Sequence, residues 1–489
     1  MNGEVERLQL GIPGFDQIAE GGIPRGRASL VVGTSGAGKT VFALQALAAG
    51  VRLYKQPGVL VTFDETPEDL LRNAQGFGWG LEEAVAEGQV AIIDCAPSHD
   101  EEQIQMGDFD FSALLARIMG AVERVHAQRV VMDSVSSLFP QFNDPYAVRR
   151  ELGRVIRGLR QERLTTLITA ERTEEYGPVA RFGVEEFVAD NVIILRNPLA
   201  GEQRRRTIEI LKFRGVAHET GEYSYTIEAG TGIRVLPRSA IESFKDASTE
   251  RVTTGIEGID EMLRGGVYRD TVMLISGATG TGKTLQVCEF VRAGAQSGER
   301  GLLLSFEESA AQLMRNAMSW GVDLRSAVDS GSVRISARYP DRMSLEDLLT
   351  QIRLEVEEFN PTRVAVDSLT AIERGASPKA FREFISGLIN CFKNAEVAAI
   401  VTITTPLMSS SEAISEMHIS TLSDAVILLR YAEVAGDLRR VLTVLKMRGS
   451  AHDRCIREYT IHDTGMALGG AIQNVEGVLS GSVVHRPST

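Results

Sequence analysis

The chain has 489 residues, of which 43% are hydrophobic and 24% are charged, and its formal net charge is −13. This length exceeds one ordinary hydrophobic core, so a globular protein of two or three domains is expected. The negative charge disfavours binding to a nucleic-acid backbone or an anionic membrane, and no apolar run approaches the roughly 20 residues that span a bilayer.

The cysteines and the N-terminus indicate the compartment. The four cysteines are far apart and form no CxxC pair, which is typical of buried thiols in a reducing environment. The first residues, MNGE, are polar and acidic, unlike a signal peptide. We therefore expect a cytoplasmic protein. The cysteines are Cys95, Cys288, Cys391 and Cys455.

A glycine-rich loop follows the first apolar run, SLVVG. It reads GTSGAGKT at residues 33–40 and precedes a helical stretch. The glycines of such a loop let backbone N–H groups surround phosphate oxygens, and the following helix directs its positive end at the same anion. Lys39 is expected to reach the β- and γ-phosphates of ATP, and Thr40 to hold Mg²⁺. The expected nucleotide-binding residues are Gly33, Thr34, Ser35, Gly36, Ala37, Gly38, Lys39 and Thr40.

An acidic pair follows the next apolar run, GVLVTF. Asp64 and Glu65 come about 25 residues after the lysine of the loop. Two carboxylates at the carboxyl end of a strand are well placed to orient or deprotonate a nucleophile. A helix is expected to begin at Pro67. One acid of the pair is expected to serve the chemistry and the other to cap this helix.

Two later features of the first half also carry charge. Asp133 ends the apolar run RVVMD, where it is expected to reach Mg²⁺ through water or, alternatively, to cap the next turn.

Farther on, TIEILKF and YSYTIEA alternate apolar and polar residues, which predicts a hairpin at the sheet edge. Lys212 and Arg214 share one face of it. They either supply charge to a γ-phosphate or protect an edge strand.

The second half repeats these motifs in the same order, at offsets of 234 to 244 residues. The loop recurs as GATGTGKT, the acidic pair as FEES, and the hairpin as LKMRGSAH. A duplication of this length is a tandem domain rather than a short solenoid repeat. The second set comprises Gly277, Ala278, Thr279, Gly280, Thr281, Gly282, Lys283 and Thr284 for nucleotide, Thr284 and Asp367 for Mg²⁺, Glu307 and Glu308 for catalysis, and Lys446 and Arg448 on the hairpin.

The order of elements predicts the fold. In each copy short apolar runs alternate with helical stretches, which is typical of an α/β domain with a mainly parallel twisted sheet, flanking helices and right-handed crossovers. We expect a first domain at residues 1–236, a linker at 237–250, a second domain at 251–468 and a short tail at 469–489.

The copies differ in one stretch. VEEFVADN in the first aligns with HISTLSDA in the second, so Ser420 and Thr421 replace Glu186 and Phe187. Hydroxyls that occur in one copy alone suggest phosphoryl acceptors. The alternative is an ordinary polar loop.

The motifs GATGTGKT, FEES, RNAxSWG, HISTLSD and KMRGSxHD, in this order, resemble those of the KaiC family of clock proteins. The first copy agrees through VTFDETP and EEYGPVARFGVEEFVADN, so the resemblance covers nearly the whole chain. It implies two RecA-like domains stacked as two rings of a homohexamer, with ATP bound between subunits. It also implies slow ATP hydrolysis in the first ring, and autokinase and dephosphorylation activity in the second.

The resemblance also implies roles for individual residues. Each acidic pair becomes the hydrolytic acids of its own domain, and Ser420 and Thr421 become paired phosphorylation sites. Arg374 falls in a family segment near the second site. The residues that match groups meeting nucleotide from the adjacent subunit are Lys212, Arg214, His218, Lys446, Arg448 and His452.

The chain departs from the family in two places. Asp64 stands where the family usually has Glu, so its carboxylate is one methylene shorter. The C-terminal extension that the activator KaiA grips is cut short just past LSGS, so regulation by KaiA is not expected. The partner KaiB, which the resemblance places on the first domain, is compatible with the sequence.

Two other classes of protein fit the tandem P-loops. A RecA-like DNA recombinase would need basic DNA-gripping loops, against which the acidic balance speaks. A nucleotide-gated scaffold would bind ATP with little turnover. Nucleic acid and membrane are therefore not expected partners.

Overall fold

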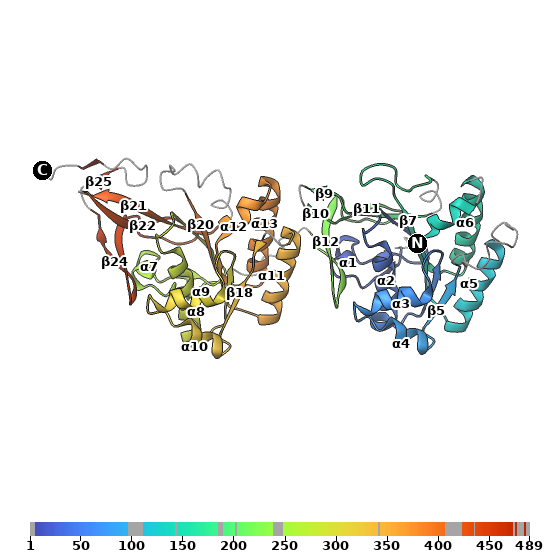
Figure 1. The fold of residues 1–489 in the computed structure, drawn as a ribbon, viewed down its shortest axis with the longest axis horizontal. Helices are drawn as coiled ribbons and strands as arrows, with labels where there is room; N and C mark the ends of the chain where they lie inside the picture. Colours follow the sequence, from blue (N-terminus) through green and yellow to red (C-terminus); the bar gives the residue numbers. More distant parts are fainter. Residues whose placement is uncertain are drawn as a thin grey trace. The chain divides into compact units, whose positions relative to one another are not determined.

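The computed structural model describes residues 5–95, 111–141, 145–183, 189–200, 203–237, 248–340, 343–405, 423–434, 436–472, 475–476 and 484–485. The chain divides into two compact units, Met1–Arg238 and Ser239–Thr489. The colours of Figure 1 run from blue to green over the first unit and on to red over the second. Each unit is built on one mainly parallel sheet of nine strands with helices, which confirms the predicted α/β, RecA-like fold class.

The strand order in the first unit is β13-β12-β11-β8-β3-β7-β6-β4-β5. The strands from β8 to β5 run parallel, and β11, β12 and β13 extend the sheet in antiparallel fashion. The predicted hairpin is therefore present as β11 and β12, but the outermost strand is β13. The bounds are β3 (Ala28–Gly33), β4 (Gly58–Thr62), β5 (Val90–Asp94), β6 (Arg129–Asp133), β7 (Thr165–Glu171), β8 (Asn191–Arg196), β11 (Thr207–Phe213), β12 (Glu222–Glu228) and β13 (Gly232–Val235), with short pairs β1 (Arg7–Leu8) and β2 (Ile23–Pro24), and β9 (Leu199–Ala200) and β10 (Gln203–Arg204).

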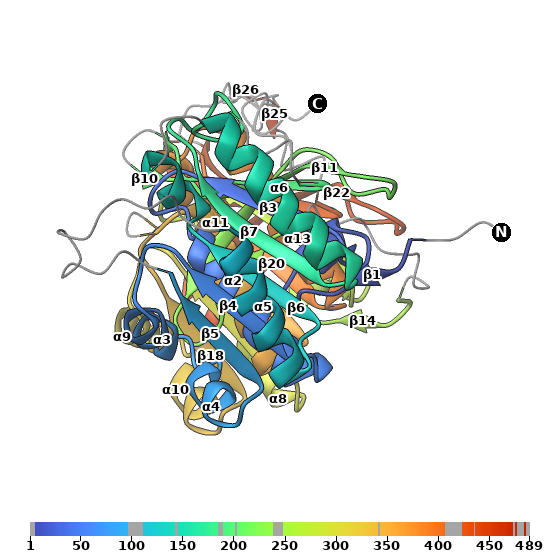
Figure 2. The same ribbon diagram turned by 90° about the vertical axis from the view of Figure 1, so that its right-hand side faces the viewer.

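Helices cover both faces of this sheet. One apolar core joins the sheet to α1 (Phe15–Ile18), α2 (Lys39–Tyr54), α3 (Pro67–Gln75) and α4 (Leu81–Ala86). A second core lies beneath α5 (Phe111–Val125), the 3₁₀ helix η2 (Val135–Gln141) and α6 (Pro145–Gln161). Figure 2 shows α5 and α6 in front of the strands of this sheet. Because both faces are covered, the parallel strands are continuous apolar runs, and every residue of β3 is buried.

The second unit repeats the plan with the order β18-β17-β19-β20-β16-β21-β22-β23-β24. Its strands are β14 (Arg251–Val252), β15 (Val267–Tyr268), β16 (Val272–Gly277), β17 (Gly301–Ser305), β18 (Val333–Ala337), β19 (Arg363–Asp367), β20 (Ala398–Thr404), β21 (Ala425–Val434), β22 (Asp437–Met447), β23 (Arg457–His462), β24 (Gly465–Ala471), β25 (Val475–Glu476) and β26 (Val484–His485). One core contains α7 (Glu257–Met262), α8 (Lys283–Gln296), α9 (Ala310–Met318) and α10 (Leu324–Asp329), and the other contains α11 (Leu345–Phe359), α12 (Leu369–Gly375) and α13 (Pro378–Asn394). Within the described ranges, we find no helix that is both long enough and apolar enough to cross a membrane.

A buried arginine at the start of one strand ties each unit together. Arg129, 4% exposed, donates to the carbonyl oxygen of Gln9 at 2.7 Å and to that of Ala46 at 2.9 Å. Arg363 holds the same place in the second unit, where it donates to the Thr253 carbonyl at 2.7 Å. Each guanidinium thus fastens the N-terminal segment of its unit to the sheet and to the helix that follows the P-loop.

We expect Arg129→Leu to lower the free energy of unfolding of the first unit by roughly 2–4 kcal/mol, because buried carbonyls lose their partner. The measurement is urea unfolding followed by the fluorescence of Trp79, in a Trp320→Phe background, since these are the two tryptophans of the chain. Arg72→Leu is the control, because Arg72 is exposed and should change stability by less than about 0.5 kcal/mol. An equal, small effect of both substitutions would contradict the structural role.

Two candidate nucleotide sites

Both P-loops join a central strand to the helix that follows it. In the first unit β3 leads into α2, and in the second β16 leads into α8. Gly38 and Gly282 are the residues before the helices, with φ angles of 85° and 88°. Gly36 and Gly280 have φ angles of 78° and 80°. A side chain would be strained at these positions, so the glycines permit the turn that a phosphate cradle requires.

The lysine of each loop bends back onto the loop. The Nζ of Lys39 donates to the Thr34 carbonyl at 3.1 Å. The Nζ of Lys283 donates to the carbonyls of Gly277 at 2.9 Å and Ala278 at 3.0 Å. Burial lowers the pKa of both ammonium groups. A phosphate anion in the loop would favour their charged form, so the loop suits the predicted ligand.

A hydroxyl and a carboxylate meet beside each lysine. The Oγ1 of Thr40 lies 3.0 Å from Oδ2 of Asp133, and the Oγ1 of Thr284 lies 2.6 Å from Oδ2 of Asp367. The structure therefore brings together both predicted magnesium pairs. Oxygen atoms of this kind are the ligands that Mg²⁺ prefers, usually with water and phosphate completing its shell. The chemistry of the pairs fits that ion.

A second threonine, which the sequence analysis missed, supports each carboxylate. The Oγ1 of Thr169 donates to Oδ1 of Asp133 at 2.6 Å, and the Oγ1 of Thr402 donates to Oδ1 of Asp367 at 2.5 Å. These threonines lie on the neighbouring strands β7 and β20. Their recurrence in both copies, in TTLITAE and AAIVTIT, is the signal that could have identified them.

The second member of each acidic pair is half-buried. Glu65 accepts a hydrogen bond from Asn73 Nδ2 at 3.0 Å, and Glu308 accepts one from Asn316 Nδ2 at 2.8 Å. Burial raises the pKa of both carboxyl groups, and the nearby carboxylate of the magnesium pair raises it further. A glutamate with a raised pKa is a stronger base than an ordinary one, which suits it to proton transfer.

The first member of each pair is exposed. Asp64 lies at the surface of the site, and Glu307 accepts a hydrogen bond from Ser368 Oγ at 3.2 Å. Neither member caps the following helix, so that expectation was wrong. The caps are Thr66 and Ser309, whose hydroxyls accept from the backbone three residues later. Ser and Thr are preferred caps because a short hydroxyl reaches these N–H groups, which leaves both acids available to the site.

We expect Asn73→Ala to move the acidic limb of ATP turnover to higher pH. The amide of Asn73 lowers the raised pKa of Glu65, so its loss lets the carboxylate take up a proton at a higher pH and lose its function as a base. The measurement is the pH profile of released phosphate. Gln75→Ala is the control on the same helix, because its amide binds Glu82 instead. Superimposable profiles of Asn73→Ala and the unaltered chain would contradict the role of Glu65.

The hairpin cations lie at the other end of the sheet. Lys212 pairs with Val192 and donates to the Ala189 carbonyl at 3.4 Å, near the amino end of β3. Arg214 follows it and lies 3.4 Å from Asp190. Through Val192, Lys212 is level with Leu30, three residues or roughly 10 Å before the carboxyl end of β3, where the P-loop begins. These cations therefore face away from the P-loop of their own copy.

The second copy repeats this arrangement. Lys446 donates to the Ser423 carbonyl at 2.7 Å, and Arg448 lies 3.6 Å from Asp424. Burial lowers the pKa of Lys446.

The remaining predicted residues are dispersed. The Nδ1 of His218 lies 3.0 Å from the Glu219 carbonyl oxygen, and its ring meets Phe213 edge-on. His452 is half-buried after the hairpin, and Arg374 is exposed in the last turn of α12. Glu186, Phe187, Ser420 and Thr421 lie outside the described residues.

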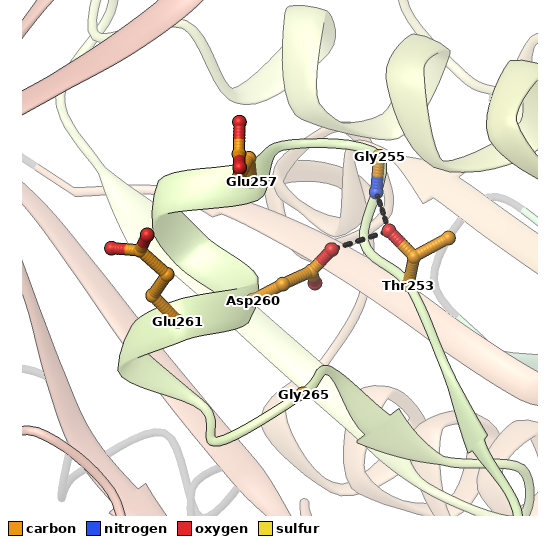
Figure 3. Close-up of a pocket in the computed structure, with 6 residues that line it drawn as sticks. All are labelled: Thr253, Gly255, Glu257, Asp260, Glu261 and Gly265. Carbon is orange, nitrogen blue, oxygen red and sulfur yellow. Dashed lines mark hydrogen bonds between the residues drawn. The ribbon is translucent and has the colours of Figure 1, made fainter.

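A separate pocket opens beside α7 in the second unit (Figure 3). Asp260, at its centre, accepts hydrogen bonds from Thr253 Oγ1 and from the Thr254 amide, the latter at 2.7 Å. Its acidic lining would repel phosphate, so we assign it no part in nucleotide binding. The lining residues are Thr253, Gly255, Glu257, Asp260, Glu261 and Gly265.

Comparison with known proteins finds one family that both halves of the chain match. The model of the KaiC ATPase family matches residues 8–240 and again residues 252–471. The circadian clock oscillator protein KaiC of Thermostichus vulcanus is 47% identical over 98% of this chain and 92% of its own length. The circadian clock protein KaiC3 of Synechocystis sp. is 47% identical over 98% of this chain and 95% of its own length. KaiC of Synechococcus elongatus is 46% identical over 98% and 92% respectively.

Proposed function

The chain belongs to the KaiC family of ATPases, and we propose that its two copies divide two phosphoryl-transfer reactions between them. The first copy transfers the terminal phosphate of ATP to water. The second transfers it to Ser420 and Thr421 of the same protein. One observation carries this division. Both copies have the P-loop lysine, the threonine and aspartate of the magnesium pair, and the acidic pair, whereas the hydroxyl pair, Ser420 and Thr421, occurs in the second copy alone.

The side chains support both reactions in the same way. Lys39 or Lys283 would leave its loop carbonyls for phosphate oxygens, and the threonine and aspartate beside it would hold Mg²⁺, which would offset charge on the phosphates. The acidic pair accepts the proton of the attacking water or hydroxyl as the new O–P bond forms and the bond to ADP breaks. A serine or threonine hydroxyl is a poor nucleophile at neutral pH, so this base is essential.

The place of the hairpin cations favours sites shared between subunits. In one copy Lys212 and Arg214 lie at the opposite end of the sheet from the P-loop. In a ring of like subunits, such a surface can face the P-loop of the next copy, where cations stabilise the charge of the transferred phosphate. We therefore propose a homohexamer in which ATP bridges adjacent chains.

We expect the chain to assemble into hexamers with Mg·ATP and to dissociate without nucleotide, because the bound phosphates bridge two subunits. Light scattering of the same sample with and without ATP measures this. Lys212→Ala/Arg214→Ala should weaken assembly, whereas the exposed Arg72→Ala should not. A monomer under saturating ATP would rule out the shared site.

Phosphate release and phosphate incorporation, measured together with ATP labelled at its terminal phosphate, test the proposed division. The account expects both products from one purified chain. A DNA recombinase would instead bind single-stranded DNA on a filter and hydrolyse ATP faster in its presence. A scaffold would release hardly any phosphate. We also propose that a KaiB-like protein binds the first domain and that the protein acts in the cytoplasm.

A further inference from the structure

Arg430 is a buried arginine on β21 that forms no ion pair with any residue in the described part of the chain. Its side chain is 6% exposed, and Nη1 donates to Thr405 Oγ1 at 3.1 Å. Nε and Nη2 are buried and have no hydrogen-bond acceptor among the residues that the structure describes. These two atoms form one edge of the guanidinium, the edge that binds a carboxylate or phosphate through two parallel bonds.

The corresponding arginine of the first copy is balanced. Arg196 donates through Nη2 to Glu209 at 2.5 Å, and Nη1 lies 3.3 Å from Glu222. Its Nε donates to the Glu175 carbonyl oxygen at 3.1 Å. The same edge that is open in Arg430 is therefore filled in Arg196 by groups of the chain itself.

The second copy has lost both counter-ions. With the offset of 234 residues that relates Arg196 to Arg430, Glu209 corresponds to Thr443 and Glu222 to Ile456. An arginine buried without an anion is costly, whereas one whose partner arrives from outside gains a strong charge-assisted pair. The second copy thus has the cation without the two internal anions that would compete with a ligand.

Arg430 also lies beside the second P-loop. Its partner Thr405 donates its backbone N–H to the Gly277 carbonyl oxygen at 3.2 Å. The same carbonyl oxygen accepts a hydrogen bond from Lys283 Nζ. In addition, Leu429 is in register with Gly277 on the neighbouring strand. One residue of the loop thus connects Arg430 to the lysine of the nucleotide site.

We propose that Arg430 is a binding residue for a phosphate group at the second site, and specifically for the terminal phosphate of ATP. The inference rests on the proposed nucleotide site and adds a cation to it. The corresponding cation of the first copy, Arg196, is paired with carboxylates of its own chain. The γ-phosphate of ATP is terminal and carries more charge than a bridging phosphate, and free phosphate can occupy the same position, whereas ADP has no group there. The second site should therefore distinguish ATP from ADP more strongly than the first.

The test uses the full chain in a Trp79→Phe background, so that Trp320 reports unfolding of the second unit. Thermal unfolding is followed without ligand and with inorganic phosphate, Mg·ADP or Mg·ATP, since a ligand of the folded state raises the midpoint by mass action. Arg430→Gln removes the charge. Thr443→Glu keeps the arginine and restores the counter-ion of the first copy. Arg439→Gln, which removes a partly exposed cation paired with Glu458, is the matched control.

Arg430→Gln and Thr443→Glu should each weaken ATP and phosphate binding about 10-fold while changing ADP binding less than about 2-fold. Weaker phosphate binding with unchanged ATP binding would overturn the assignment to ATP, because the arginine would then bind the free ion alone. Equal weakening of ATP and ADP would overturn the assignment to the terminal phosphate. Unchanged binding of all three ligands, with a higher midpoint for ligand-free Arg430→Gln, would overturn the site. If the unaltered chain gains no stability from ATP or ADP, the proposed function itself fails.

Discussion

We expect Lys39→Ala to remove most steady-state ATP turnover and Lys283→Ala to remove phosphorylation of the chain. Each lysine is the one loop cation aimed into its own cradle, where Lys39 Nζ binds the Thr34 carbonyl and Lys283 Nζ binds that of Gly277. Loss of a preorganised charge at a transferred phosphoryl group typically costs 10²–10³-fold in rate. Released phosphate and chain-bound phosphate, measured on the same sample, separate the two effects.

Arg52→Ala is the matched control for the first lysine. Arg52 is an exposed cation near the end of α2, the helix that begins at Lys39. It should leave both activities within about 2-fold of the unaltered chain, because an exposed charge is screened by solvent. If either lysine substitution left both activities intact, the assignment of the P-loops would be wrong.

We expect Ser420→Ala/Thr421→Ala to abolish incorporation of phosphate into the chain and to leave ATP turnover by the first copy in place. The variant lacks the acceptor hydroxyls but retains both sets of lysine, magnesium pair and acidic pair. Incorporation of labelled phosphate should fall to the background of Lys283→Ala. Ser411→Ala, which removes a hydroxyl from the same segment of sequence, is the control and should retain incorporation.

Mixed rings test the direction of transfer. Chains with Lys283→Ala keep their acceptors, and chains with Ser420→Ala/Thr421→Ala keep an intact second P-loop. Transfer between subunits would place phosphate on the Lys283→Ala chains of the mixture. If neither chain were labelled although each variant folds and assembles, transfer would have to occur within one subunit.

The sequence predicted the parts of the fold that depend on periodicity and repetition. Short apolar runs such as SLVVG become parallel strands covered on both faces, and all six residues of β3 are buried. The two P-loops and the strand-end acids Asp133 and Asp367 were recognisable because each occurs twice at corresponding positions. The meeting of each acid with its P-loop threonine follows from parallel strands, whose carboxyl ends lie at one edge.

The rest of the site depends on contacts between distant segments. Asn73 and Thr169 support Glu65 and Asp133, yet neither differs locally from any other polar residue on a helix or strand. The cap of α3 was mispredicted. The backbone N–H of Asp69 donates to the short side chain of Thr66 and not to the longer one of Glu65. The unbalanced charge of Arg430 emerges only when its sheet neighbours are compared with those of Arg196.

Phosphopeptide mass spectrometry of the purified chain, incubated with Mg·ATP alone, tests the central claim most directly. The account predicts phosphate on Ser420 and Thr421, without any partner protein and absent from the Lys283→Ala chain. Phosphate at other residues, or none after long incubation with ATP still being hydrolysed, would contradict the autokinase and make the hydroxyl pair an ordinary polar loop.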